Sequence, residues 1–225
     1  MGKTAIIITF IFFLLGVGHV QAGSDEARER TNAGVKLLQQ GKTDEAVTEF
    51  EKAVTLDPDY VAAHVNLAYA YDRQGRVEEA MDGYRRVIEL APEDVMAHNN
   101  LGVLYDKKGL YNEAIGAFEQ ALRIDPTNAN AQKNLENAKK NKATIQGRQD
   151  RIAQAQKEVE DHPTSPRASY KLARLYAFYG KKDQAIEWLD KALKMGFNDL
   201  DYLKADPALK DLRDDPSFAR LLKAR

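Results

Sequence analysis

The sequence predicts an all-α protein, built as a solenoid of stacked helix hairpins and closed by C-terminal capping helices. Three observations lead to this fold. Proline, glycine, alanine and an aromatic residue each recur with a period of 34 residues. Apolar residues within each period follow helical spacing. The composition, with 44% hydrophobic and 30% charged residues among 225, is typical of a folded chain.

The first element is expected to be a secretory signal peptide over residues 1–22. Lys3 precedes an apolar run from Ala5 to Val17, and Val20-Gln21-Ala22 carries small or aliphatic residues where a signal peptidase reads. Cleavage after Ala22 would place the chain in the periplasm or outside the cell, with no membrane span left. The alternative is an uncleaved membrane anchor, although a spanning helix needs roughly 20 apolar residues.

Three repeat units follow, over residues 27–60, 61–94 and 95–128. They share four residue types at matching positions: Gly41, Gly75 and Gly109; Ala46, Ala80 and Ala114; Phe50, Tyr84 and Phe118; Pro58, Pro92 and Pro126. Four residue types that share one period make chance a poor explanation.

Each unit is predicted to be a helix hairpin. In the third unit a first helix ends at Gly109, where a left-handed cap suits glycine. Tyr111 to Ile124 forms a second amphipathic helix, and its small Ala114 and Gly116 predict a close helix approach. Since one hairpin cannot bury its apolar face alone, the hairpins are expected to stack.

These repeats resemble the tetratricopeptide repeat (TPR) family, and specifically an exported bacterial protein of that family. The third unit matches the family pattern with Leu101-Gly102, Tyr105, Ala114, Phe118 and Pro126. The opening tryptophan of the pattern is replaced by Arg30, His64 and His98. The resemblance implies a right-handed superhelical solenoid whose first helices line a concave inner surface.

The remaining chain divides into three predicted parts. Residues 129–165 form extension helices, one over 129–142 that closes the stack and one over 149–160 that links onward. Residues 166–197 form a degenerate fourth hairpin, and residues 198–225 form capping helices. Asp206 and Asp215 each precede a proline and predict helix N-caps. The capping helices are expected to bury Leu209, Leu212, Phe218, Leu221 and Leu222.

No catalytic, cofactor-binding or metal-binding group is expected. There is no cysteine, only four histidines, and no glycine-rich phosphate loop. His64 and His98 invite a metal site, but two ligands are too few, and packing at the missing tryptophan position is the preferred interpretation. The balance of 33 basic and 34 acidic residues argues against a nucleic-acid partner.

The most specific pattern is a column of asparagines at one repeat position, namely Asn32, Asn66, Asn100 and Asn134. Such amides can pair with the backbone of an extended chain, because each both donates and accepts. The alternative is that they bond only within and between the repeats. Both interpretations satisfy the amides.

The same offsets predict the other residues of a peptide-binding groove. They are Val65, Tyr69, Arg73, Met96, Asn99, Val103 and Lys107. The apolar members form a patch with polar neighbours, which suits an extended protein segment. The basic clamp with which some family members hold chaperone tails is not carried over, since only Asn66 has a counterpart in it.

We therefore expect a non-catalytic scaffold that binds a protein segment or peptide in the concave groove. The alternative is a structural or accessory subunit of an envelope or secretion assembly, which contacts partners or self-associates through its outer faces and C-terminal tail. A repeat surface is generic and does not name its partner.

Overall fold

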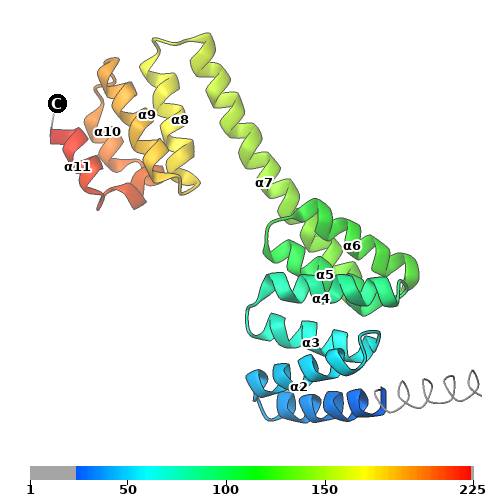
Figure 1. The fold of residues 1–225 in the computed structure, drawn as a ribbon. Coiled ribbons are helices and arrows are strands. Elements are labelled where there is room, and N and C mark those ends of the chain that lie inside the picture. The colour runs from blue at the N-terminus through cyan, green and yellow to red at the C-terminus, as the bar shows by residue number, and fades with distance from the viewer. Residues whose placement is uncertain (1–23, 224–225) are drawn as a thin grey trace, which may run out of the picture. The chain divides into compact units, whose positions relative to one another are not determined.

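The computed structural model describes residues 24–223, so the predicted signal peptide lies outside the described residues. These residues are helical throughout, apart from the turns between helices, and no strand occurs among them. They divide into two compact units, the first ending at Lys140 and the second beginning at Asn141. The predicted all-α architecture is confirmed (Figure 1).

The first unit consists of helix hairpins in sequence. Residues 24–39 are helical and are followed by α2. The bounds of the next helices are α2 Thr43–Leu56, α3 Val61–Arg73, α4 Val77–Leu90, α5 Val95–Lys107 and α6 Tyr111–Ile124. Helix α7, Ala129–Asp161, begins where the next first helix is due.

The turn within each hairpin depends on a glycine in the left-handed region. Gly41, Gly75, Gly109 and Gly180 have φ values of 77°, 74°, 74° and 74°. In each turn the amide after the glycine donates to a carbonyl five residues earlier, for example Leu110 to Tyr105 at 2.9 Å. This is the Schellman arrangement that terminates a helix. Its recurrence at Gly180 shows that the hairpin in the second unit uses the same turn as the three in the first.

Close contact between the two helices of a hairpin also depends on small residues. A Cβ atom added at Gly34 would lie 2.5 Å from the Phe50 ring, and one added at Gly102 would lie 2.6 Å from the Phe118 ring. Real Cβ contacts are not that short. The aromatic ring of the second helix is therefore seated directly on the glycine of the first.

The second hairpin reaches the same closeness in another way. Ala68 occupies the glycine position there, and Gly83 of α4 faces it, so that a Cβ at Gly83 would lie 2.7 Å from the Ala68 Cβ. By contrast, nothing lies within 4 Å of a Cβ added at Gly116. The prediction that Gly116 lies at a close helix crossing was wrong, because this residue faces outward from α6 and is exposed.

One hydrogen bond recurs across the turns between the hairpins. The fourth residue of a first helix donates its side chain to the carbonyl of the proline six residues earlier. The pairs are His64 to Pro58 (2.8 Å), His98 to Pro92 (2.9 Å) and Gln132 to Pro126 (2.8 Å). Because a carbonyl only accepts, Nε2 of both histidines carries the proton. These side chains fasten the turn to the next helix.

Helix α7 corrects one expectation. Two helices, over 129–142 and 149–160, were expected, whereas α7 runs without interruption from Ala129 to Asp161. The intervening residues contain no proline, and their single glycine, Gly147, costs a helix only about 1 kcal/mol. In the first unit Ala138 of α7 packs with Ala114 and Phe118, and so covers the last hairpin.

The second unit contains a hairpin and its cap. The elements are α8 Pro166–Phe178, α9 Lys182–Lys194, α10 Leu200–Ala205, the 3-10 helix η1 Pro207–Leu212 and α11 Pro216–Lys223. As predicted, Leu209, Leu212 and Phe218 are buried, with Leu221 and Leu222 packed against the same core. The Asp206 carboxylate accepts from the Ala208 amide at 2.9 Å and so caps η1.

Asp206 also joins the cap to α8. Its side chain is buried and accepts a hydrogen bond from the Tyr170 hydroxyl at 2.5 Å. Nε of Arg174 lies 2.5 Å from its Oδ2 in an ion pair, and an Nη of Arg174 donates to its Oδ1 at 3.4 Å. Burial raises the pKa of Asp206, but the hydrogen bonds from Tyr170, Ala208 and Arg174 outweigh burial and lower it. The charged form of Asp206 is therefore stabilised in the folded unit.

Substituting Ala114 tests the predicted helix crossing. Ala114 is fully buried against Phe118 and Ala138, so we expect Ala114→Leu to lower the free energy of unfolding by about 1–3 kcal/mol through overpacking. Urea denaturation measures this. The control is Gly116→Ala in the same helix, which we expect to stabilise the protein, since alanine is the better helix former. An unchanged unfolding midpoint for Ala114→Leu would contradict the described packing.

Candidate functional site

The predicted groove residues all lie on the first helices of the hairpins. Asn32 lies in the helix over residues 24–39, and Asn134 lies in α7. Helices α3 and α5 carry the rest, which we call the α3–α5 strip: Val65, Asn66, Tyr69 and Arg73, with Met96, Asn99, Asn100, Val103 and Lys107.

The α3–α5 strip exposes two large apolar side chains. Tyr69 is 42% exposed and Met96 is 51% exposed, whereas Val65 and Val103 are half-buried and pack against core residues. Few large apolar side chains are exposed among the described residues of the first unit, and these are two of them. They are available for an apolar contact that the fold itself does not use.

Two basic residues of the strip are held in place by neighbours. A guanidinium nitrogen of Arg73 donates to the Tyr69 hydroxyl at 3.3 Å. Nζ of Lys107 lies 2.7 Å from a carboxylate oxygen of Asp72, which ties α5 to α3. Both cations remain at the surface, but Asp72 offsets the charge of Lys107, so Arg73 is the residue of this pair that adds positive charge beside the apolar side chains.

The four column asparagines do not form a uniform ladder. Asn32 is exposed on its helix. Asn66 donates to the Ala62 carbonyl of its own helix at 2.7 Å. Asn100 donates to the Tyr84 hydroxyl at 3.1 Å, and Asn134 donates to Asn99 at 3.0 Å. The alternative in which these amides bond within the fold therefore applies to three of the four.

The stacking geometry explains why column members do not bond to one another. Contacts between neighbouring first helices join residues 35 positions apart, as Asn134 and Asn99 do, and as Lys107 and Asp72 do. The column members are 34 apart. The partner position of Asn100 is thus Val65, which has no polar side chain. Among the column members, Asn134 alone has an amide partner in the neighbouring repeat, and that partner is Asn99.

Asn100 bonds to a buried tyrosine hydroxyl, that of Tyr84. Its side chain is 2% exposed, and its hydroxyl accepts the Asn100 amide. Burial raises the pKa of Tyr84 to about 12. Phe50 and Phe118 occupy the same position in the other repeats and have no hydroxyl, so the equivalent asparagines bond elsewhere. Asn100 is an internal strut that satisfies a buried hydroxyl.

Neither a metal-binding cluster nor a membrane-spanning helix is found in the part of the chain that the structure describes. Residues 24–223 contain no group of three or more histidine, aspartate or glutamate side chains placed to hold a metal ion. Nor does any helix among them combine the length and the apolar character needed to cross a bilayer.

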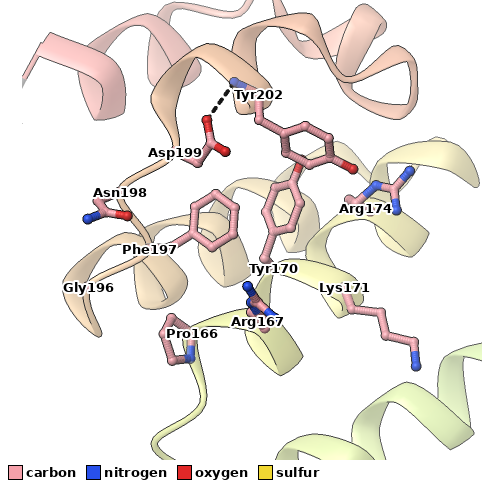
Figure 2. A pocket seen from close by; sticks show the side chains of 10 residues that line it. All are labelled: Pro166, Arg167, Tyr170, Lys171, Arg174, Gly196, Phe197, Asn198, Asp199 and Tyr202. Atoms are coloured by element: carbon pink, nitrogen blue, oxygen red, sulfur yellow. Dashed lines mark hydrogen bonds between the residues drawn. The ribbon is translucent and has the colours of Figure 1, made fainter.

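A cavity in the second unit was not predicted from the sequence. It has a volume of about 570 Å³ and lies between α8 and the segment that joins α9 to α10. Figure 2 shows the rings of Tyr170, Phe197 and Tyr202 at its centre, with Arg167, Lys171 and Arg174 around them. The Tyr170 and Phe197 rings stack with centroids 4.3 Å apart, and Tyr202 meets Tyr170 edge-on at 6.0 Å.

One feature of the sequence could have indicated the basic residues of this cavity. Arg167, Lys171 and Arg174 are spaced four and three residues apart, which places them on one face of a helix. Phe197 and Tyr202 come from the capping segment, and nothing in the sequence pattern brings them to α8. Their position depends on how the cap folds back onto the hairpin.

The Asn100–Tyr84 contact gives a prediction for stability. Asn100→Ala leaves the buried Tyr84 hydroxyl without a partner, so we expect a loss of about 1–3 kcal/mol in the free energy of unfolding. The second change Tyr84→Phe should recover part of this loss, as a double-mutant cycle in urea would show. The exposed Asn32→Ala is the control. Equal effects of Asn32→Ala and Asn100→Ala would contradict the strut.

Three sequence models of one family match the chain. All three are described as tetratricopeptide repeat, and they match residues 37–104, 95–128 and 166–196. A search of curated proteins returned no match.

Several solved structures share the fold. The first TPR domain of Spaghetti (RPAP3) bound to HSP90 peptide SRMEEVD is 26% identical, with a TM-score of 0.52, covering 53% of this chain and 95% of that one. The first TPR domain of human RPAP3 is 24% identical, with a TM-score of 0.52, covering 54% and 96%. MamA is 20% identical, with a TM-score of 0.50, covering 81% and 96%. The last two likenesses concern the fold alone.

The family matches cover repeats of both units, and they agree with the recurring glycine turns at Gly41, Gly75, Gly109 and Gly180. The chain therefore carries tetratricopeptide repeats, and its architecture is that of an all-α tetratricopeptide repeat solenoid.

Proposed function

We propose that this protein is a non-catalytic interaction scaffold that binds an extended protein segment along the α3–α5 strip. The observation that carries the proposal is the pair of exposed apolar side chains, Tyr69 and Met96, on the first helices of adjacent repeats. A similar structure of the same repeat type was solved with a peptide bound, which supports this use of the fold.

The polar members of the strip have distinct roles in this proposal. Tyr69 and Met96 supply apolar contact area. Asn66 and Asn99 each donate one hydrogen bond through an amide N–H, and the Asn99 oxygen also accepts one from Asn134. An amide has two N–H donors and an oxygen with two lone pairs, so each side chain keeps a donor and an acceptor position. Each can therefore also pair with a peptide unit of the ligand. Arg73 favours a carboxylate beside the apolar contact, whereas Lys107 already pairs with Asp72.

The alternative role, as an accessory subunit that contacts partners through its C-terminal tail, needs a different test from simple truncation. The tail contributes to the core of the second unit through Leu209, Leu212 and Phe218, and its Asp206 side chain is also buried. Deleting the tail would unfold that unit and abolish any activity located there. Substitutions of exposed side chains are the informative test.

Binding through the strip predicts a loss of affinity when its apolar members are truncated. Peptides selected from a random display library on the purified protein serve as ligands. We expect Tyr69→Ala with Met96→Ala to weaken their binding at least tenfold, which requires about 1.4 kcal/mol, as measured by isothermal titration calorimetry. The thermal midpoint should stay close to that of the unchanged protein, since both side chains are exposed.

The matched control is Leu56→Ala with Leu110→Ala. These two leucines are each 37% exposed in the same unit but lie outside the strip. Unchanged binding by the strip variant, or an equal loss in the control variant, would refute the strip as the binding surface.

We also propose that the protein is exported and acts in the periplasm or outside the cell. The support is the sequence of residues 1–22, with its basic start, apolar run and Val20-Gln21-Ala22. N-terminal sequencing of the protein from its native cell should begin at Gly23. A start at Met1 in the membrane fraction would instead show an uncleaved anchor.

A further inference from the structure

The cavity in the second unit has the size and the lining of a small-molecule site. Such sites have volumes of about 300–1,000 Å³, aromatic and apolar walls, and a few polar groups that orient the ligand. This cavity has a volume of about 570 Å³, with aromatic rings at its centre and charged and amide side chains around them (Figure 2). It lies in the second unit, so its use is independent of the α3–α5 strip.

A glycine turn after α9 places the aromatic wall of the cavity against α8. Gly196 has a φ of 100°, and the Phe197 amide donates to the Ala192 carbonyl at 3.0 Å, as in the hairpin turns. The chain continues into α10, where the Tyr202 amide donates to the Asp199 carboxylate at 3.0 Å. These hydrogen bonds set the positions of Phe197 and Tyr202, so the wall forms without a ligand.

The aromatic wall, which consists of Tyr170, Phe197 and Tyr202, is suited to a flat apolar face. The Tyr170 and Phe197 rings stack with an interplanar angle of 22° and centroids 4.3 Å apart, so no planar base can enter between them. The Tyr170 ring is buried, whereas Tyr202 is 48% exposed. A ligand face laid against Tyr202 and Phe197 would remove ring surface from water, which is favourable.

Two of the three cations that line the cavity are already paired. Arg174 pairs with the buried Asp206 carboxylate, and Lys171 pairs with Glu158 at the surface. Arg167 is exposed and makes no hydrogen bond or ion pair with any other residue in the range 24–223. Its guanidinium is therefore available to donate to a ligand.

The wall formed by the α9–α10 segment supplies acceptors. Asp199 uses one carboxylate oxygen to cap α10, and its other oxygen has no hydrogen-bond partner among the described residues. The Asn198 side chain is exposed and likewise has no partner within residues 24–223. Because the charges of Arg167 and Asp199 cancel, the lining offers donors and acceptors together without a net unpaired charge. This combination suits a neutral ligand with several hydroxyl groups.

We propose that this cavity binds a neutral β-linked oligosaccharide, one ring of which rests on the aromatic wall. In a β-linked glucose unit the hydroxyl groups project from the edge of the ring, and the two faces carry only C–H bonds. A face can therefore lie against Tyr202 and Phe197 while the edge hydroxyls reach the polar groups. The Arg167 guanidinium donates to hydroxyl oxygens, the second oxygen of Asp199 accepts from hydroxyl groups, and the Asn198 amide does both.

An anionic ligand fits this arrangement less well. The Asp199 charge offsets that of Arg167, and Lys171 and Arg174 have carboxylate partners of their own. An acyclic polyol fits less well for a different reason, because it has hydroxyl groups but no flat apolar face. The ligand is thus defined by a ring with apolar faces and a hydroxylated edge.

The test is a titration of the isotope-labelled protein with cellobiose, followed by the NMR shifts of the backbone amides. We expect saturable shifts in the segment from Gly196 to Tyr202, and a Kd at least tenfold below that of sorbitol, an acyclic polyol. Arg167→Ala with Tyr202→Ala should weaken cellobiose binding at least tenfold. Both side chains are exposed, so this variant should stay folded.

The variant Asp199→Asn separates a sugar site from an anion site. Asparagine keeps an oxygen that can cap α10 but removes the charge, so cellobiose should bind about threefold more weakly. An anion would gain affinity from the same change, because a repulsive charge is lost. Equal or tighter cellobiose binding by this variant would overturn the proposal.

The matched control is Phe178→Ala with Lys194→Ala, which removes an exposed ring and an exposed cation of the same unit outside the cavity. Its affinity for cellobiose should stay within twofold of that of the unchanged protein. The proposal also fails if cellobiose causes no saturable shift at the cavity, if sorbitol or inorganic phosphate binds as tightly, or if the control loses as much affinity as the cavity variant. Circular dichroism of each variant confirms that it is folded.

Discussion

The seating of an aromatic ring on a small residue of the facing helix is the constraint on which the repeats depend. Phe50 contacts Gly34 and Phe118 contacts Gly102 so closely that no side-chain carbon fits between them. In the middle hairpin the glycine is on the second helix: Gly83 of α4 lies against Ala68 of α3 and allows the same close approach. Once the helices are this close, the left-handed glycine turn is the short connection that joins them.

Stacking of the hairpins then decides which side chains can meet between repeats. The offset of 35 residues between contacting positions, against a sequence period of 34, shifts each residue by one place relative to its own equivalent. An asparagine column in the sequence is therefore not a bonded column in space. Each amide takes the nearest partner its surroundings offer: its own helix for Asn66, a tyrosine hydroxyl for Asn100, and Asn99 for Asn134.

In the second unit a buried charged side chain joins the elements, whereas the first unit is joined by the stacking of its repeats. Asp206 receives hydrogen bonds from Tyr170 and Ala208 and an ion pair from Arg174, and so joins the cap to the hairpin. Removing Arg174 would leave the Asp206 carboxylate buried without its cation, which is unfavourable. The Arg174 side chain is 42% exposed, so the residue that pairs with the buried carboxylate also lines the cavity between α8 and the α9–α10 segment.

The sequence by itself determined the all-α class, the hairpin period, the glycine turns and the capping residues Asp206 and Asp215. These follow from local backbone preferences and from apolar spacing, both of which are written within a few dozen residues. It also placed the groove candidates on the first helices, because the period of 34 residues fixes the position of each residue within its repeat. It did not determine the continuity of α7, where no residue is a strong helix breaker. Nor could it reveal that Gly116 faces solvent, that Asn100 bonds Tyr84, or that Phe197 and Tyr202 meet α8. Those outcomes were decided by the tertiary structure, because each depends on which atoms of distant segments arrive within hydrogen-bonding or packing distance.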